Sequence, residues 1–172
     1  SISLCAPLLY EVSASPKPGL VDRYNSGAHR DMDFFSFMRS STALYPYFAA
    51  CAREGMQFED SDSGGLFRRL RPLGMDAEKE MLSATGGANT HKGLIFSIGI
   101  ICAAAGLNCA SAGMNCASTG MNCAAGGINR AGTCRYPLEV DEICKTVSEM
   151  TQGICKAELE GSGGCTLTNG ER

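Results

Sequence analysis

Residues 85–93, Thr-Gly-Gly-Ala-Asn-Thr-His-Lys-Gly, decide how the chain around them folds. The stretch combines the signals for a helix end, a glycine turn and a new helix start. Gly86 and Gly87 can take the left-handed conformation that closes a helix. Asn89 or Thr90 can accept hydrogen bonds from the free N–H groups of the next helical turn. We therefore expect two helices to meet at this junction.

The second helix of the junction opens with two basic residues. His91 and Lys92 precede the apolar run at 94–101, LIFSIGII. A lysine in the first turn opposes the helix dipole, at a cost of roughly 0.3–1 kcal/mol. An anion nearby offsets that cost, and helix N-terminal N–H groups are known phosphate sites. The junction is therefore predicted to bind a phosphate through Lys92, His91 and the N–H groups near Asn89 and Thr90.

The overall composition limits what the protein does. Of the 172 residues, 44% are hydrophobic and 19% are charged, as in a globular domain with its own core. A net charge of −3 argues against a general nucleic-acid or membrane-surface binder, so any anion site must be local. No uninterrupted apolar run approaches the roughly 20 residues of a membrane span, and no signal peptide opens the sequence. The expected location is the cytoplasm, where ten cysteines without a CxxC pair predict reduced thiols and no zinc site.

A stiff loop at 15–22, SPKPGLVD, is the second feature that points to a ligand. Pro16 and Pro18 fix the backbone on both sides of Lys17. The loop is therefore predicted to present the Lys17 cation at a defined place. Asp22 closes the loop, and no helix cap accounts for its carboxylate.

Apolar residues that recur every three or four positions predict the remaining helices. They lie at 1–14, 33–54, 62–73, 76–84 and 138–160, in addition to the helix that starts at His91. Within the first of these, Pro7 predicts an effective start near Ala6. No convincing run of alternating strand residues is found. The predicted fold class is all-α, an irregular multi-helix bundle formed by 1–172 as a single domain.

Local signals set the boundaries of the predicted helices. Asp31 or Asp33 is predicted to cap the helix at 33–54, and Gly55 is predicted to end it. Gly74 and Asp76 are predicted to separate the two helices at 62–73 and 76–84. The junction at 85–93 then follows the second of them.

A heptapeptide repeat occupies 106–131, with the units GLNCASA, GMNCAST, GMNCAAG and the decayed GINRA. A glycine in every unit costs roughly 1 kcal/mol of helix stability, and only one large apolar residue recurs per unit. Three interpretations stay open: an inserted exposed loop, a weak helical extension, or a thiol stripe formed by Cys102, Cys109, Cys116 and Cys123.

The chemically active side chains fall in two loop-to-helix junctions. The chain has only two histidines, His29 with Asp31 close by and His91 beside Lys92. Asp22 and Asp31 are candidates for Mg²⁺, which is typically held by one or two carboxylates plus phosphates and waters. The 85–93 motif is not a Walker A loop, since no strand precedes it and no Gly-Lys-Ser/Thr ends it. Spacing alone predicts a helical protein with a local polyphosphate site.

The combination of motifs is more specific than any one of them. In order along the chain, it comprises Glu11-Val12, Pro16–Asp22, Gly27–Met32, Phe37, Ser40-Ser41 and Thr85–Gly93. This set closely resembles the triphosphoribosyl-dephospho-CoA synthase family in sequence, order and interval. The resemblance covers most of 8–105 and resumes weakly in the helix at 138–160.

The resemblance implies an all-α transferase whose substrates are ATP and 3′-dephospho-CoA. Adenine is released, and the product is the prosthetic-group precursor for the acyl carrier protein of citrate lyase or malonate decarboxylase. The intact triphosphate is implied to serve as a handle, held by Lys17, Asn89, Thr90, Lys92 and Ser40. His29, His91 and Asp31 are the implied catalytic residues, and Asp22 and Asp31 the implied ligands of the Mg²⁺ that accompanies ATP.

The chain departs from the family in two places. The 106–131 repeat resembles an insertion where family members are much shorter. The final segment at 168–172, TNGER, resembles a Thr-His-Gly-Glu-Arg motif with Asn169 in the histidine place, and the family continues past it. The resemblance therefore implies association with a further C-terminal portion, or a homo-oligomer, to complete the enzyme.

Two other functions fit the same residues. A non-catalytic helical module would bind a nucleotide or acidic partner on one basic face made by Lys17, Lys92 and the arginines at 68–71. These arginines are otherwise a solvated helix face. A different ATP-using enzyme would cleave the phosphate chain. Detection of free adenine as the product would exclude this alternative.

Overall fold

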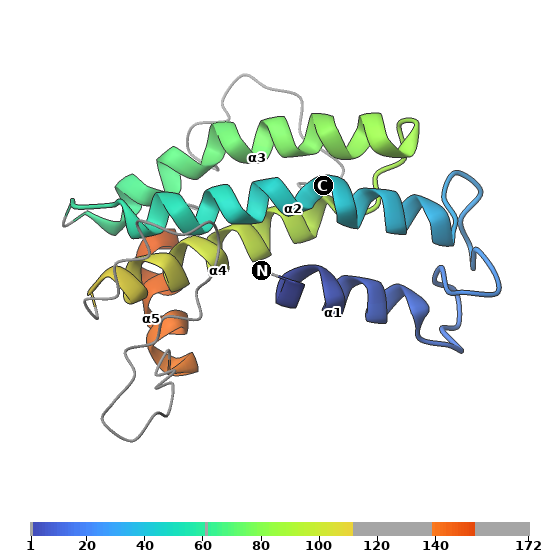
Figure 1. Ribbon diagram of the computed structural model, residues 1–172, viewed down its shortest axis with the longest axis horizontal. Helices are drawn as coiled ribbons and strands as arrows, with labels where there is room; N and C mark the ends of the chain where they lie inside the picture. Colours follow the sequence, from blue (N-terminus) through green and yellow to red (C-terminus); the bar gives the residue numbers. More distant parts are fainter. Residues whose placement is uncertain (1, 61, 112–138, 154–172) are drawn as a thin grey trace.

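The computed structural model describes residues 2–60, 62–111 and 139–153, and all regular structure in these ranges is helical. The five helices are α1 (Ile2–Ser13), α2 (Phe34–Met56), α3 (Ser63–Thr85), α4 (Lys92–Ser111) and α5 (Val140–Thr151). Figure 1 shows them as a bundle without a sheet. The predicted all-α class is therefore confirmed.

The bundle is built around α2, which packs against α1, α3 and α4. Contacts between α2 and α4 advance together along both helices, from Ser40–His91 to Tyr47–Ile95, so the two run parallel. α3 returns in the opposite direction beside them, and α5 crosses the far end against α3 and α4 (Figure 1). The core consists of buried apolar side chains from α2, α3, α4 and α5, with Leu44, Phe48, Leu66, Met81, Ala103 and Met150 among the most buried.

Close approach of the α2 and α4 backbones depends on small residues. A Cβ placed on Gly55 would overlap the carbonyl oxygen of Ala103, and one on Gly106 would overlap that of Ala52. The two glycines therefore let each helix rest on the backbone of the other. About two turns closer to the N-termini, the Tyr47 hydroxyl lies against Gly99 and donates to the Ile95 carbonyl at 2.9 Å.

The start of α2 follows the prediction and its end does not. Asp33, one of the two predicted caps, accepts from the Ser36 N–H at 2.7 Å and completes a capping box with that residue. The helix continues through Gly55 to Met56, so the prediction that Gly55 ends it was wrong. Gly55 instead serves the contact with α4, which a local turn signal does not reveal.

The two helices predicted at 62–73 and 76–84 are a single helix, α3. Gly74 and Asp76 lie inside it, as does Pro72. The predicted break was wrong because tertiary packing outweighs these local signals: Leu66, Leu70, Ala77 and Met81 keep one continuous buried face. In the same way, α1 begins at Ile2, before Pro7, and not near Ala6.

α4 extends further than the apolar pattern suggested. Its 20 residues include the first repeat unit as far as Ser111, which is therefore helical, and 112–131 lie outside the described residues. α4 is long and apolar enough to cross a membrane by length and composition alone. In this structure it packs against α2, α3 and α5. Of the proposed thiol stripe, Cys102 is buried and Cys109 half-buried, while Cys116 and Cys123 fall outside the described residues.

α5 confirms part of the helix predicted at 138–160. Its Met150 side chain is buried in the core, and Thr146 donates to the Asn108 side chain of α4 at 2.9 Å. The helix ends at Thr151, and Gly153 beyond it has a positive φ of 78°. Residues 154–160 lie outside the described part of the chain.

Candidate functional site

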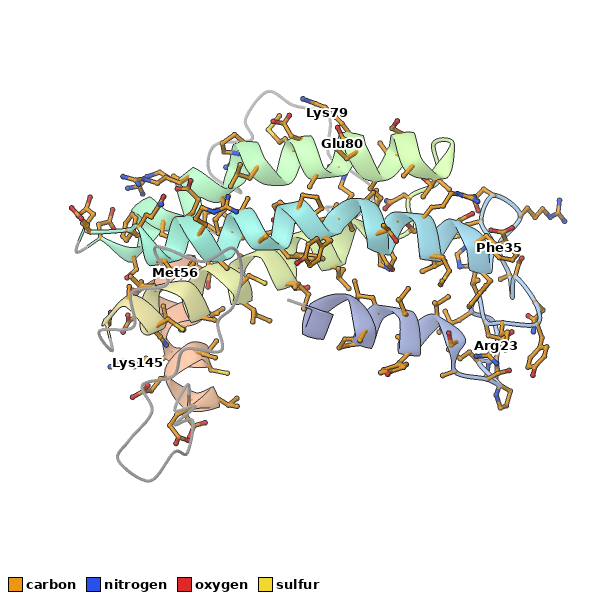
Figure 2. The ribbon with its side chains drawn as sticks, in the orientation of Figure 1. Arg23, Phe35, Met56, Lys79, Glu80 and Lys145 are labelled. Carbon is orange, nitrogen blue, oxygen red and sulfur yellow. The ribbon has the colours of Figure 1, made fainter. Side chains whose placement is uncertain are left out.

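The two predicted loop-to-helix junctions come together at one end of the bundle. There α2 begins, α3 ends and α4 begins, and the 14–33 loop joins α1 to α2 (Figure 1). Figure 2 shows Arg23, from this loop, and Phe35, from the first turn of α2, at the same end. The charged residues Lys79 and Glu80 point outward from α3, and Met56 and Lys145 lie toward the other end.

The turn between α3 and α4 has the predicted conformation. Gly86 and Gly87 have positive φ values of 70° and 98°, and Gly87 donates its N–H to the Leu82 carbonyl at 2.7 Å. Asn89 Oδ1 accepts from the Lys92 N–H at 3.2 Å and so caps the start of α4. Thr90, the alternative cap, donates its hydroxyl to Ser40 of α2 instead. The glycine turn and the Asn89 cap are thereby confirmed.

His91 is held in a buried setting at this turn. The residue is only 7% exposed, and its Nδ1 lies 2.6 Å from the Ser40 hydroxyl. The Phe37 ring stands edge-on to the imidazole, with centroids 5.0 Å apart. Burial lowers the pKa of His91 below its ordinary value, and the negative charge of Glu11 partly opposes that shift. At neutral pH the ring is therefore uncharged.

Both candidate lysines have carboxylate partners. Lys92, on the exposed rim, pairs with Glu78 of α3 at 2.8 Å. Lys17, whose side chain is only 16% exposed, pairs with Glu11 of α1 at the same distance. The lysine at the start of α4 thus has a negative group beside it, as the dipole argument requires, but the group is a carboxylate of the protein. A phosphate bound at this place would replace Glu78 as the ion-pair partner of Lys92.

Asp22 organises the 15–25 loop from inside. Its two oxygens accept from the Ser15 hydroxyl, the Lys17, Tyr24 and Asn25 N–H groups and the Asn25 amide, at 2.7–3.3 Å. The Ser15 hydroxyl and these N–H groups lower the pKa of Asp22 to about 2. Asp22 is buried and its oxygens are already occupied, so the geometry supports a role in shaping the Lys17 loop and gives no support for metal binding.

His29 and Asp31 lie on the outside of the same loop. The His29 Nδ1 is 4.0 Å from the Asp31 carboxylate, and both side chains are exposed. Gly19 and Gly27, both with positive φ, pack backbone against backbone to close this loop. Among the described residues no hydrogen bond, ion pair or ring contact joins His29 to His91 or Lys92. The Asp31 carboxylate stays accessible to a ligand or metal.

The arginines at 68–71 lie apart from this site. They are in the first half of α3, about 10–15 Å along the helix from Glu78, the partner of Lys92, at 1.5 Å per residue. Arg68 pairs with Asp62 at 2.7 Å, and Arg69 covers the Phe58 ring at 5.2 Å. Arg68 and Arg69 are thus engaged with residues near the start of α3, away from Lys92.

Sequence reasoning assigned no role to Glu78, and it used Glu11 only as part of a family motif. Glu78 is 14 positions before Lys92, and only the reversal of direction between α3 and α4 brings the two together. Glu11 reaches Lys17 across the end of α1. No spacing rule for a helix or a loop indicates either pair.

The assembled site combines two lysines in exchangeable ion pairs, a neutral buried imidazole and an exposed carboxylate. The described residues hold no group of three or more His, Cys, Asp or Glu side chains that could bind a metal by themselves. Such a set suits a polyanion with its accompanying cation better than a protein-only metal centre.

Comparison with known proteins identifies several relatives. A protein of Lactiplantibacillus plantarum named "Probable 2-(5''-triphosphoribosyl)-3'-dephosphocoenzyme-A synthase" is 50% identical over 98 residues, which cover 57% of this chain and 35% of that protein. A protein of the same name from Streptococcus pyogenes serotype M5 is 52% identical over 99 residues, 58% of this chain and 34% of its own length. Protein CitXG of Leuconostoc mesenteroides subsp. cremoris is 53% identical over 97 residues, 56% of this chain and 21% of its own.

The matched segment thus spans about a third or less of the length of these relatives. No solved structure matches the chain. A family model described as ATP:dephospho-CoA triphosphoribosyl transferase matches residues 3–168, nearly the whole sequence. The chain therefore belongs to the ATP:dephospho-CoA triphosphoribosyl transferase family.

Proposed function

We propose that this chain supplies the triphosphate-binding end of an enzyme that transfers the triphosphoribosyl group of ATP to 3′-dephospho-CoA. The observation that carries the proposal is the shared end of the bundle: the α3–α4 turn with His91 and Lys92 lies at the same end as the Lys17 loop, and the charge of Glu11, the partner of Lys17, acts on His91 (Figure 1). Family membership and the product named in the relatives point to the same reaction.

The reaction exchanges one bond at the anomeric carbon of the ATP ribose. The bond from C1′ to the adenine nitrogen breaks, and a bond from C1′ to the 2′-hydroxyl oxygen of dephospho-CoA forms. The hydroxyl loses its proton and adenine leaves with one. An oxocarbenium-like transition state is expected, as in other glycosidic cleavages. Because the phosphates do not react, their binding energy can hold the sugar in position for attack.

The ion pairs at the site suggest how the triphosphate enters. Its oxygens replace the Glu78 carboxylate on Lys92 and the Glu11 carboxylate on Lys17, so both lysines keep a negative partner. Charge-assisted hydrogen bonds of this kind are short and strong. The backbone N–H groups of Asn89 and Thr90 are proposed to bind the same phosphates.

Magnesium is proposed to accompany ATP, and the residues differ in how they fit it. The exposed Asp31 carboxylate fits, since one carboxylate with phosphates and waters is a common set for Mg²⁺. Asp22 does not fit, because donors of its own loop occupy both oxygens. When bound, the cation neutralises phosphate charge, while the two lysines and the turn N–H groups orient the chain of phosphates.

The product is proposed to become the prosthetic group of an acyl carrier protein, that of citrate lyase or malonate decarboxylase. A soluble, cytoplasmic setting is proposed with it. The short coverage of the relatives supports a second proposal, that further protein contributes to the binding of dephospho-CoA. That protein is either another portion of the same enzyme or a second copy of this chain.

A chimera tests the function. In the L. plantarum relative, the 98 residues that match are replaced by those of this chain, and the chimera receives ATP, Mg²⁺ and dephospho-CoA. The proposal predicts free adenine and a triphosphoribosyl product by mass spectrometry, with no adenine when dephospho-CoA is withheld. The parent protein serves as the control for turnover.

The other outcomes identify the alternatives. Release of ADP and phosphate would show an enzyme that cleaves the phosphate chain. ATP binding without adenine release, by a folded chimera whose parent turns over, would show a nucleotide-binding module. Either result contradicts the transferase proposal.

A further inference from the structure

A chain of three polar groups connects α4 to α2 beneath the site. The Thr90 hydroxyl lies 2.8 Å from the Ser40 hydroxyl, which lies 2.6 Å from His91 Nδ1. Ser40 is fully buried, so a ligand cannot reach its hydroxyl directly. Whatever Ser40 contributes must therefore pass through its two neighbours.

The two bonds together indicate which atom donates at each step. The Thr90 hydroxyl donates to the Ser40 oxygen. The proton of the fully buried Ser40 hydroxyl then needs an acceptor, and His91 Nδ1 is its other neighbour among the described residues. Ser40 is therefore the donor to His91, and its oxygen accepts the hydroxyl proton of Thr90. Each hydroxyl then donates once, in the order Thr90, Ser40, His91.

We infer that Ser40 and Thr90 are positioning residues that hold His91 as a neutral imidazole with its proton on Nε2. A neutral imidazole carries one N–H, and a nitrogen that accepts a hydrogen bond cannot carry it. The hydroxyl chain thus fixes both the tautomer and the orientation of the ring. Phe37 holds the ring edge-on from the adjacent turn of α2.

The other nitrogen of the His91 ring, Nε2, is not completely buried. No described residue forms a hydrogen bond with His91 Nε2. In the described ranges, the one fully buried side-chain polar atom without a partner is Asn108 Nδ2, so Nε2 is not sealed inside the protein. The Nε2–H is therefore available to a ligand, while Nδ1 is committed to Ser40. Protonation of Nδ1 would require the Ser40 hydroxyl to turn and break its bond.

This arrangement gives His91 one chemical role, a role that rests on the proposed function. The Nε2–H donates a hydrogen bond to a phosphate oxygen or to a nitrogen of the departing adenine. It cannot accept the proton of the incoming hydroxyl, because Nε2 already carries one. The general base must then be another group, and the exposed His29 is the second imidazole of the chain.

Nitrogen NMR on the full 172-residue chain tests the inference. With ¹⁵N-histidine labelling only His29 and His91 are observed, and exposed His29 reports a solvated ring in the same sample. The spectrum is recorded at a pH well above about 6.5, the ordinary imidazole pKa. We expect His91 to show a protonated Nε2 and an unprotonated Nδ1, with a larger excess of this tautomer than His29. A protonated Nδ1 would overturn the inference.

Matched serine variants separate positioning from packing. Ser40→Ala is expected to lower the tautomer ratio of His91 about fivefold or more, the effect of losing one buried hydrogen bond. Thr90→Val is expected to move it in the same direction by less. Ser41→Ala is the control, because Ser41 is the neighbouring buried serine and donates to the Phe37 carbonyl of its own helix. An unchanged ratio in both Ser40→Ala and Thr90→Val would overturn the inference.

Titration with MgATP separates this inference from the proposed function. If both hold, the Nε2 resonance of His91 shifts on binding while Nδ1 stays unprotonated. A protonated Nδ1 in the complex would overturn the inference. If no resonance shifts and the unbound tautomer is as expected, the positioning by Ser40 and Thr90 stands and the ATP site is refuted.

Discussion

Substitution Gly55→Ala tests the contact that sets the spacing of α2 and α4. The new Cβ would overlap the Ala103 carbonyl oxygen and lie 2.8 Å from its carbon and 2.9 Å from the Leu107 nitrogen. These distances are shorter than the roughly 3.5 Å optimum for non-bonded atoms. All three atoms belong to the α4 backbone and cannot rotate away. The helices must therefore move apart along their shared core.

The expected loss of stability follows from two opposing terms. Overpacking of a core costs about 1–3 kcal/mol, and contact with rigid backbone places this case at the upper end. Alanine in a helix gains roughly 1 kcal/mol over glycine. The net loss for Gly55→Ala is therefore about 2 kcal/mol, which lowers Tm by roughly 4–8 °C for a domain of this size.

Gly74→Ala in α3 is the matched control. A Cβ there meets only Tyr47 Oη at 3.6 Å and Ile95 Cγ2 at 3.8 Å, which are ordinary contacts. The helix-propensity gain then remains, so Tm should rise by about 2–4 °C. Thermal unfolding by circular dichroism measures both variants. Equal changes of Tm in the two would refute the proposed role of the α2–α4 contact.

Three further predictions concern the site and the core. Lys92→Ala should weaken MgATP binding by about 1.5–3 kcal/mol, measured by calorimetry. Lys79→Ala, which removes the same charge from the outer face of α3, should leave binding unchanged, and equal losses in the two variants would show that Lys92 does not bind ATP. Burial lowers the pKa of His91, so on acidification the unfolded chain binds a proton at this residue before the folded chain does. The stability of the protein to urea should therefore fall as the pH drops below about 6.5. No such fall in the wild type, or an equal fall in His91→Gln, would contradict this. Burial raises the pKa of Cys51 to about 11, so iodoacetamide should label it on the order of a hundredfold more slowly than exposed Cys144 until urea is added; equal rates in peptide mapping would show an open core.

The junction at 85–93 shows how far local sequence reasoning reaches. The local sequence predicts the glycine turn, the Asn89 cap and a lysine that needs a negative partner, since each is set by a few neighbouring residues. It did not identify Glu78 as that partner or Ser40 as the residue that orients His91. Ser40 and His91 are 51 positions apart and meet only because α2 and α4 run parallel.

The boundaries of α2 and α3 show the opposite failure. Gly55, Gly74 and Asp76 are ordinary breaking signals, and each lies inside a helix in the structure. Packing of the long buried faces stabilises these helices by more than a single glycine costs. Gly55 is itself part of that packing, a role that depends on the partner helix and has no signature along the chain.

The central claim is that the triphosphate of ATP is held intact while its ribose changes partner. The direct measurement uses ATP with heavy isotopes in the ribose and follows the label through the chimera by mass spectrometry. We predict that the label and all three phosphates appear together on dephospho-CoA, and that the released adenine is unlabelled. Label recovered in ADP, or a CoA product that lacks any of the three phosphates, would contradict the account.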